Sequence, residues 1–377
     1  MALKTAIIGV GPVGDRIWSC LKERNFPLDG PPVVMATRAR TEVLGGDEVD
    51  VLEVAAEHFA GVKVAFFAGR EGAKGASVIW KDAAEQAGAV CIDNGSDFRL
   101  YPDIPLVVPE VNMDDVTADT KFIASPNCST IQMVVALAPL HRVARIRRIV
   151  VTTFQSVSGW GAAAQDELKA QLPCLVKGDK IVCDPSIFPR PIALDCLPHI
   201  DSFLDNGYTK EEMKMLHETR KILGDPDISV VPTAVRVPVE IGHSEAINVE
   251  FEGPMNAQMA LEILSDPAQA EGVVVIDGPT QDPARLDYLA GKGKKEQKPW
   301  AMHWEVTERQ YPTQADVLRD DWKDMTLVGR VRDDHTRTNS INLWCVADNL
   351  RKGAALNAVQ IAEKIIENRI GKSGGKR

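Results

Sequence analysis

The chain has 377 residues, of which 45% are hydrophobic and 25% are charged, and its formal net charge is -10. Such a composition is typical of a globular protein with two or three domains, and the negative charge argues against non-specific binding to nucleic acid or an anionic membrane. No apolar run approaches the roughly 18 residues that a membrane-spanning helix needs. The seven cysteines include no CxxC pair, so we expect no metal site, no disulfide framework and a cytoplasmic location.

Short apolar runs alternate with helical patterns in the first part of the chain. Strands that alternate with helices indicate βαβ units and a parallel sheet. The segments that predict strands are 5–10, 32–37, 62–69, 89–94, 105–112 and 121–125, and those that predict helices include 15–25 and 77–88.

The first predicted strand leads into a glycine-rich turn. Gly9, Gly11 and Gly14 form a GxGxxG pattern, with Pro12 and Val13 inside it, directly before a helix. These glycines permit a tight turn and the close approach of a pyrophosphate to the helix N-terminus. The segment therefore predicts a dinucleotide site, and a plain strand-to-helix turn is the alternative.

The residues after the second predicted strand bear on the choice of cofactor. An acidic residue there usually selects NAD, whereas this chain has Thr37, Arg38 and Arg40. Arginine suits a 2′-phosphate, so we expect NADP(H) as the cofactor. Two solvated arginines without such a role are the alternative.

The segment 122–137 reads FIASPNCSTIQMVVAL and contains a candidate nucleophile, Cys128. Pro126 and Asn127 predict a turn, and the apolar positions that follow have helical spacing. A thiol at a helix N-terminus faces the positive end of the helix dipole and is expected to lose its proton more easily. The alternative is a small buried cysteine, which is the interpretation we favour for the other six.

The second half of the chain has a different pattern. Its predicted strands are longer, alternate between apolar and polar residues and are rich in β-branched side chains, as in an antiparallel sheet. Thr209 and Glu212 form a capping-box pattern before a helix, and a charged, low-complexity stretch at 291–300 predicts an exposed loop. The strand segments are 146–159, 228–239, 243–253 and 326–334, and the last predicted helix is 352–371.

Six long segments resemble, in order, segments of the aspartate-β-semialdehyde dehydrogenase family. The resemblance covers nearly the whole chain and is weakest at 283–325. It departs from the family in the glycine turn, which is one residue shorter than usual, and in the stretch 68–81. The six segments are 90–112, 125–140, 152–168, 197–225, 236–251 and 342–363.

The resemblance implies an α/β fold with a Rossmann-type NADP-binding domain and a second α+β catalytic and dimerisation domain with a mainly antiparallel sheet. The first domain would be 1–127, completed by the C-terminal helix at about 347–377, and the second would be 128–346. The implied reaction is the NADPH-dependent reductive dephosphorylation of L-aspartyl-4-phosphate to L-aspartate-4-semialdehyde, in lysine, methionine, threonine and isoleucine biosynthesis. A homodimer or homotetramer is implied.

The resemblance also assigns catalytic roles. Cys128 would attack the acyl phosphate and form a thioester, and His243 would be the general acid and base. Asn127 and Gln155 would line the acyl site. Histidine suits this role because it titrates near neutrality. Without the resemblance, the alternative is that His243 caps a turn.

Binding roles follow from the same resemblance. Arg236 would bind the substrate carboxylate, Arg99 and Lys214 would bind phosphate with Glu211 nearby, and Asn349 would contact the nicotinamide. Guanidinium groups suit a carboxylate because they bind it at two points. Without the resemblance, Glu211 and Lys214 would be a surface ion pair of little energy, and the two arginines would be ordinary charges of a loop and an edge strand.

Two other functions are alternatives for this sequence. N-acetyl-γ-glutamyl-phosphate reductase shares the implied fold and chemistry, but its cysteine usually follows glycine in a PGCYPT pattern. Here Cys128 follows Asn127 and precedes Ser129 and Thr130. A non-catalytic paralogue acting as a partner subunit would have lost the cysteine or His243, and this chain has both.

Overall fold

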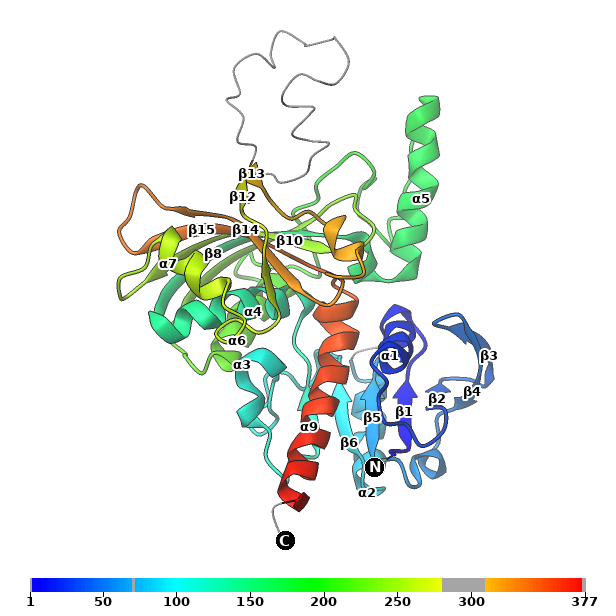
Figure 1. Cartoon of the computed structure of the whole chain (residues 1–377). Coiled ribbons are helices and arrows are strands. Elements are labelled where there is room, and N and C mark those ends of the chain that lie inside the picture. Colours follow the sequence, from blue (N-terminus) through cyan, green and yellow to red (C-terminus); the bar gives the residue numbers. More distant parts are fainter. Residues whose placement is uncertain (1, 70–71, 280–308, 375–377) are drawn as a thin grey trace.

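The structure, a computed structural model, describes residues 2–69, 72–279 and 309–374. Two large sheets, each with helices packed against it, account for most of these residues (Figure 1). None of the described helices is long and apolar enough to cross a membrane. The fold is α/β, as the sequence predicts.

The first sheet has seven strands in the order β3-β4-β2-β1-β5-β6-β7, and all neighbours are parallel except β3 and β4. This arrangement confirms the predicted parallel sheet. Its strands are β1 (Thr5–Ile8), β2 (Val33–Ala36), β3 (Arg40–Leu44), β4 (Asp47–Glu53), β5 (Val64–Phe67), β6 (Val90–Asp93) and β7 (Phe122–Ala124).

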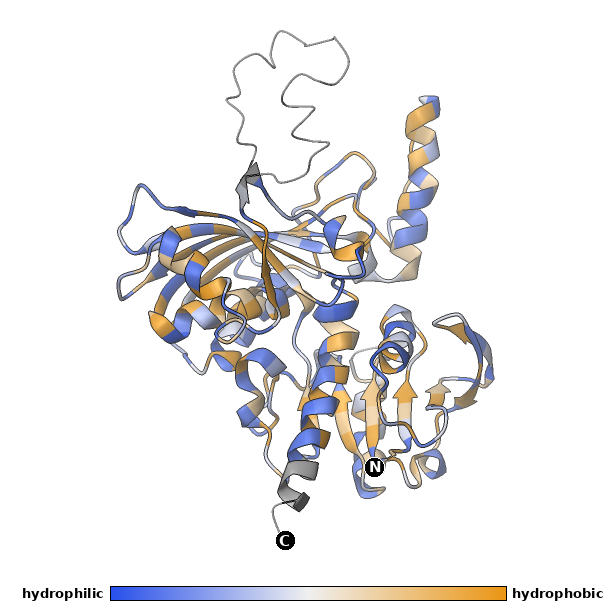
Figure 2. Cartoon of the chain, in the orientation of Figure 1, coloured by the Kyte–Doolittle hydropathy of each residue, from blue (hydrophilic) through white to orange (hydrophobic). Residues whose placement is uncertain are grey.

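Helices cover both faces of the first sheet. On β1, Ile7 packs with α1 (Pro12–Glu23) and the C-terminal helix, whereas Ile8 packs on the side of α2 (Ala76–Gln86). Since both faces are covered, every residue of β1, β5 and β6 is buried, and all but Thr5 and Asp93 are apolar, so these strands are largely orange in Figure 2. Such continuous runs are typical of a parallel sheet.

Two parts of this sheet differ from the prediction. The segment predicted as a strand at 105–112 forms only an isolated bridge, at Leu106, and then a short helix, α3 (Pro109–Asn112). Proline favours the first position of a helix, since its fixed φ suits the first turn and it has no N–H to leave unpaired. The hairpin of β3 and β4 was not predicted, because its residues are largely charged and exposed.

The second sheet has six strands in the order β11-β14-β15-β10-β8-β9. Its central pairs are antiparallel, as predicted, while β9 and β11 join the edges in parallel. The sequence did not predict β15. The strands are β8 (Ile146–Gln155), β9 (Ser229–Arg236), β10 (His243–Phe251), β11 (Val273–Val275), β14 (Thr326–Asp333) and β15 (Ser340–Ala347).

One face of the second sheet is covered by α4 (Cys128–Val143), α6 (Lys210–Ile222) and α7 (Ala257–Leu264). Every residue of α4 from Ser129 to Leu140 is buried, because this helix packs against the apolar cores of both sheets. A helix that is apolar all round belongs in such an interior position. Helix α4 therefore places its first residue, Cys128, at the junction of the two sheets.

Three further elements complete the second half. Helix α5 (Ala162–Lys177) extends away from the second sheet (Figure 1). A small sheet pairs β12 (Gly278–Pro279) with β13 (Arg309–Gln310). The exposed loop predicted at 291–300 lies outside the described residues, as does the greater part of 283–325.

The C-terminal segment returns to the first sheet. A π-helical turn (Arg351–Ala355) leads into α9 (Leu356–Gly374), which packs against α1 and the core of the first sheet. The helix predicted at 352–371 is therefore confirmed, with a different first turn.

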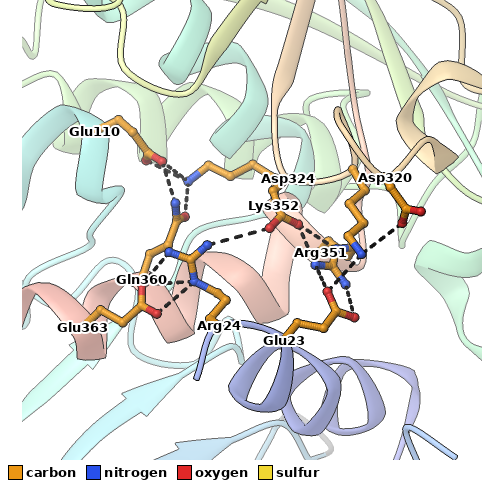
Figure 3. Close-up of polar contacts among 10 residues, drawn as sticks. Glu23, Arg24, Glu110, Asp320, Asp324, Arg351, Lys352, Gln360 and Glu363 are labelled. Atoms are coloured by element: carbon orange, nitrogen blue, oxygen red, sulfur yellow. Dashed lines mark hydrogen bonds and ion pairs between the residues drawn. The ribbon is translucent and has the colours of Figure 1, made fainter. Parts of the chain in front are cut away.

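Ion pairs fix the π-helical turn (Figure 3). Arg351 is paired with Glu23 of α1 and with Asp324, at 2.8 and 2.6 Å. Lys352 is completely buried and is paired with the buried Glu110 of α3 at 2.7 Å. These contacts hold the turn between the two sheets.

Candidate active site

A cleft of about 1160 Å³ runs between the two sheets. Gly9, Gly11 and Val13 line one part of it, and Cys128 and Arg236 line another. The predicted dinucleotide turn and the predicted nucleophile therefore face the same open space.

The glycine turn is tight where the chain requires it. Gly9 has a φ of +117°, and a Cβ there would lie 2.5 Å from the Ala68 carbonyl oxygen. A Cβ at Gly14 would lie 2.1 Å from the oxygen of Gly9, whereas a Cβ at Gly11 would meet open space. Gly11 is the N-cap of α1 and Pro12 opens that helix. The helix N-terminus thus faces an open cradle that fits a pyrophosphate.

The end of β2 presents one arginine to the cleft. Thr37 and Arg40 line it, together with Glu53, whereas Arg38 is exposed and is not a lining residue. The Arg40 side chain donates to Glu42 at 2.9 Å and to the carbonyl of Arg38 at 3.2 Å. Arg40 is thus better placed than Arg38 to meet a 2′-phosphate.

Cys128 is the first residue of α4, as the spacing predicts. Asn127 is the N-cap, and its side-chain oxygen accepts hydrogen bonds from the amides of Ser129 and Thr130 at 3.0 and 3.3 Å. The side chain of Cys128 is half-buried and lines the cleft. The π-helical turn lies against it, since a Cβ at Gly353 would be 2.9 Å from the Cys128 Cβ.

We expected the thiol of Cys128 to lose its proton easily, and for the protein without bound ligands this expectation is wrong. Burial raises the pKa of the Cys128 thiol to about 12, and the carboxylate of Glu211 acts in the same direction. Arg236, Arg99 and a backbone hydrogen bond lower the pKa, but less. The increase in pKa caused by desolvation of the thiolate therefore outweighs the decrease expected from the helix N-terminus.

Glu211 connects three of the predicted site residues. One of its oxygens accepts hydrogen bonds from Asn127 at 2.8 Å and from Gln155 at 3.2 Å. The other pairs with Lys214 at 3.4 Å, and Lys214 also pairs with Asp201 at 3.1 Å. Burial alone would raise the pKa of Glu211, but Lys214 and the two amide donors hold it below its usual value. Glu211 therefore remains a carboxylate and orients its neighbours.

Arg99 is buried and lines the cleft. Its guanidinium donates to Glu218 at 3.0 Å and to the carbonyl of Asn94 at 2.8 Å. The second oxygen of Glu218 accepts the backbone N–H of Asn127 at 2.7 Å. Glu218 thus ties Arg99 to the residue that precedes the nucleophile.

Arg236 ends β9 and is also buried in the cleft wall. It donates to the carbonyl of Ser156 at 2.7 Å. A Cβ at Gly159 would lie 3.0 Å from the Arg236 guanidinium and 3.3 Å from Nε2 of His243. The glycine therefore leaves room where these two side chains meet.

His243 begins β10 and is completely buried. Burial and the charge of Arg236 lower the pKa of its imidazole to about 3, and a backbone hydrogen bond of Gly242 acts in the opposite direction. The ring lies behind Gly159, which lines the cleft, and is not itself a lining residue. Asn349 lines the cleft and accepts the N–H of Gly242 at 2.9 Å. Its contact with a nicotinamide stays a prediction.

Among the described residues, no group of three or more histidine, cysteine, aspartate or glutamate side chains is arranged to hold a metal ion. The described part of the site consists of a thiol, an imidazole, basic side chains and the carboxylates that orient them. This set suits covalent chemistry on an anionic substrate.

Comparisons with known proteins agree with this arrangement. The semialdehyde dehydrogenase NAD-binding domain family matches residues 4–118, and the semialdehyde dehydrogenase dimerisation domain family matches 137–352. Aspartate-semialdehyde dehydrogenase 2 of Vibrio cholerae is 43% identical over 370 residues, which cover 96% of this chain and 97% of that protein. The chain belongs to the aspartate-semialdehyde dehydrogenase family. An Aquifex aeolicus member is 41% identical over 373 residues, which cover 97% of this chain and 99% of that protein.

Solved structures of this family have the same fold. The crystal structure of aspartate semialdehyde dehydrogenase II from Vibrio cholerae has a TM-score of 0.81 at 42% identity, with 97% of this chain and 99% of that chain covered. Family membership makes this chain an oxidoreductase with a domain for a nicotinamide cofactor and a dimerisation domain.

Sequence reasoning missed three residues that hold the site of this family member together. They are Asp201, Ser156 and Glu218. A signal existed for Glu218, since it follows Glu211 and Lys214 at i+7 and i+4 on one face of α6. The other two had no local signal, because their partners come from distant parts of the chain.

Proposed function

We propose that the chain catalyses the NADPH-dependent reductive dephosphorylation of L-aspartyl-4-phosphate to L-aspartate-4-semialdehyde, and the reverse phosphorylating oxidation. The observation that carries this proposal is the one cleft that joins the glycine turn to Cys128 and the basic side chains. The names of the relatives support it, as does a similar Vibrio cholerae structure described as complexed with ASA. The product would serve lysine, methionine, threonine and isoleucine biosynthesis in the cytoplasm.

The substrate carries a carboxylate and a phosphate, and the protein is net negative. Binding it requires a local cluster of positive charge, which Arg236, Arg99 and Lys214 supply within one cleft. Arg236 would bind the carboxylate at two points. Arg99 and Lys214 would receive the phosphate, and Glu211 would orient Lys214.

The first chemical step is acyl transfer to Cys128. The thiolate attacks the carbonyl carbon, a C–S bond forms, and the C–O bond to phosphate breaks with its electron pair on phosphate. Because the thiol of the free protein has a raised pKa, its proton must leave once substrate is bound. The Cys128 amide and Asn127 would stabilise negative charge on the carbonyl oxygen, and Gln155 would line the same side.

The second step is reduction of the thioester. When bound, the nicotinamide of NADPH supplies the hydride. His243 would give a proton to the oxygen of the reduced carbonyl. It would take the proton back as the carbonyl re-forms and the C–S bond breaks with its electron pair on sulfur, which releases the aldehyde and the thiolate of Cys128. In the oxidative direction the same ring would take that proton back.

The domains are proposed to divide this work. Residues 1–127 with the C-terminal helix at about 347–377 would bind the dinucleotide, with Asn349 near the nicotinamide. Residues 128–346 would carry the catalytic groups and form a homodimer or homotetramer. The packing of the C-terminal helix into the core of the first sheet supports this division.

The test is a turnover assay with aspartate semialdehyde, phosphate and NADP, followed by NADPH absorbance. Activity should require phosphate and should be absent in Cys128→Ala, with folding checked by circular dichroism. Oxidation that proceeds equally well without phosphate would contradict the proposal. Preference for the N-acetyl-glutamate semialdehyde would favour the sister reductase.

A further inference from the structure

The imidazole of His243 is held at one nitrogen and open at the other. Nδ1 lies 3.1 Å from the backbone nitrogen of Ser156 and 3.1 Å from its hydroxyl oxygen. Nε2 has no hydrogen-bond partner among the described residues and points into the space beside Gly159. One residue, Ser156, therefore offers Nδ1 both a donor and an acceptor.

The backbone contact decides the resting form of the ring. An amide N–H only donates, so Nδ1 must carry a lone pair and the neutral ring must carry its proton on Nε2. A ring in that form cannot take a proton at Nε2. To act there as a base, His243 needs its proton on Nδ1. That N–H cannot bond to the Ser156 amide, which only donates, so the amide contact is given up and the buried N–H needs a separate acceptor.

Asn349 orients the hydroxyl of Ser156 so that its oxygen can accept a hydrogen bond from Nδ1–H. Its Oδ1 accepts the N–H of Gly242 at 2.9 Å and the hydroxyl hydrogens of Ser156 and Ser158 at 3.0 and 3.2 Å. Its Nδ2 donates to Ser158 at 3.0 Å. Because Asn349 Oδ1 only accepts, the Ser156 hydroxyl donates to it. The Ser156 oxygen, which also lies 3.0 Å from the Ser158 hydroxyl, then has a lone pair for Nδ1 of His243.

We propose that Ser156 is a positioning residue for His243. The Ser156 hydroxyl accepts a hydrogen bond from the Nδ1–H group in both working forms of the ring. This inference rests on the proposed function, in which His243 exchanges a proton at Nε2. In reduction, the imidazolium gives its Nε2 proton to the carbonyl oxygen, the electron pair stays on nitrogen, and the neutral Nδ1–H ring remains. In oxidation the Nε2 lone pair of the neutral Nδ1–H ring takes the proton from the substrate hydroxyl and so forms the imidazolium, which then releases a proton to solvent. Before reduction, solvent supplies the proton that forms the imidazolium.

The positive charge of Arg236, which lies near the ring, is consistent with this role of Ser156. Burial and Arg236 hold the pKa of His243 far below its usual value in the free protein. An anionic substrate bound at Arg236 would offset that charge, and the Ser156 hydroxyl would stabilise the Nδ1 proton as it appears. Removing the hydroxyl withdraws that stabilisation and leaves the binding groups in place.

The kinetic test compares two buried serines of one network. Ser156→Ala should lower kcat about tenfold in both directions, the effect of one hydrogen bond of about 1.4 kcal/mol, with KM for phosphate and semialdehyde unchanged. Ser156→Thr should restore most of the rate. Ser158→Ala, the matched control, should cost several-fold less, because that hydroxyl does not touch His243. Equal losses in the two alanine variants, or an unchanged kcat in Ser156→Ala, would overturn the inference.

A second readout does not depend on activity. Nitrogen NMR of the labelled histidine ring in the protein without cofactor should show a lone pair on Nδ1 and a proton on Nε2, in wild type and in Ser156→Ala. A ring of His243 protonated on Nδ1 at rest would overturn the inference even in an active enzyme. Absence of wild-type turnover with the expected ring form would instead count against the proposed function.

Discussion

Replacing Lys352 with methionine should destabilise the protein strongly, because it leaves a buried carboxylate without its partner. The Lys352 ammonium and the Glu110 carboxylate are 2.7 Å apart, and their side chains are 1% and 4% exposed (Figure 3). The ammonium also donates to Gln360 at 2.8 Å. It is the group that neutralises Glu110, and the methionine cannot do so.

The magnitude follows from this burial. Removing one partner of a buried ion pair costs about 3–5 kcal/mol. For a domain of 150–250 residues, 1 kcal/mol corresponds to about 2–4 °C of melting temperature, so the loss should be about 6–20 °C. Replacing Lys352 and Glu110 together with apolar residues should recover much of this loss, because no unpaired charge is then left inside.

The assay is thermal unfolding followed by circular dichroism at one scan rate. Lys364→Met is the matched control, since Lys364 also lies on the C-terminal helix but its ion pair with Glu271 is 3.7 Å long and exposed. That variant should change stability by less than about 0.5 kcal/mol. Equal melting temperatures for the Lys352 and Lys364 variants would refute the reasoning, as would a double variant less stable than either single one.

Three further predictions concern the cleft. Alkylation of Cys128 in the ligand-free protein, measured on its peptide, should accelerate about tenfold per pH unit above neutrality, because burial raises the thiol pKa to about 12; a rate already constant at neutral pH would contradict this. Arg99→Leu and Lys214→Leu should each raise the phosphate KM in the oxidative reaction roughly ten- to a hundredfold without weakening NADP, and unchanged phosphate dependence in both would misplace the phosphate site. Arg40→Leu should weaken NADP more than NAD, and more than Arg38→Leu does; equal loss of both cofactors would exclude contact with the 2′-phosphate.

Local patterns in the sequence predicted much of the architecture. The glycine turn before α1, the helix that begins at Cys128 and the capping box of Thr209 and Glu212 all depend on residues within one or two turns of each other. Short-range geometry fixes such features, so spacing alone reveals them. The alternation of strands and helices indicated the parallel sheet, and the resemblance of six long segments indicated the family.

Local patterns failed where a segment takes its structure from distant partners. In the hairpin of β3 and β4, half of the strand residues are charged, and the apolar alternation is limited to Val49 and Val51, which is too short to predict a strand. Strand β15 was missed although its sequence, SINLWCVA, is largely apolar; its place between β10 and β14 depends on those distant partners. In the segment 105–112, apolar residues predicted a strand, but Pro109 begins a helix.

The sequence by itself determined which side chains this protein can use: a thiol at a helix start, a histidine, basic groups for anions and a turn for a dinucleotide. Only the tertiary structure decided their state. The raised pKa of Cys128, the tie from Glu218 to Arg99 and the ring form of His243 all depend on contacts across long stretches of chain. Desolvation and hydrogen-bond direction are properties of a packed interior, and linear spacing does not encode them.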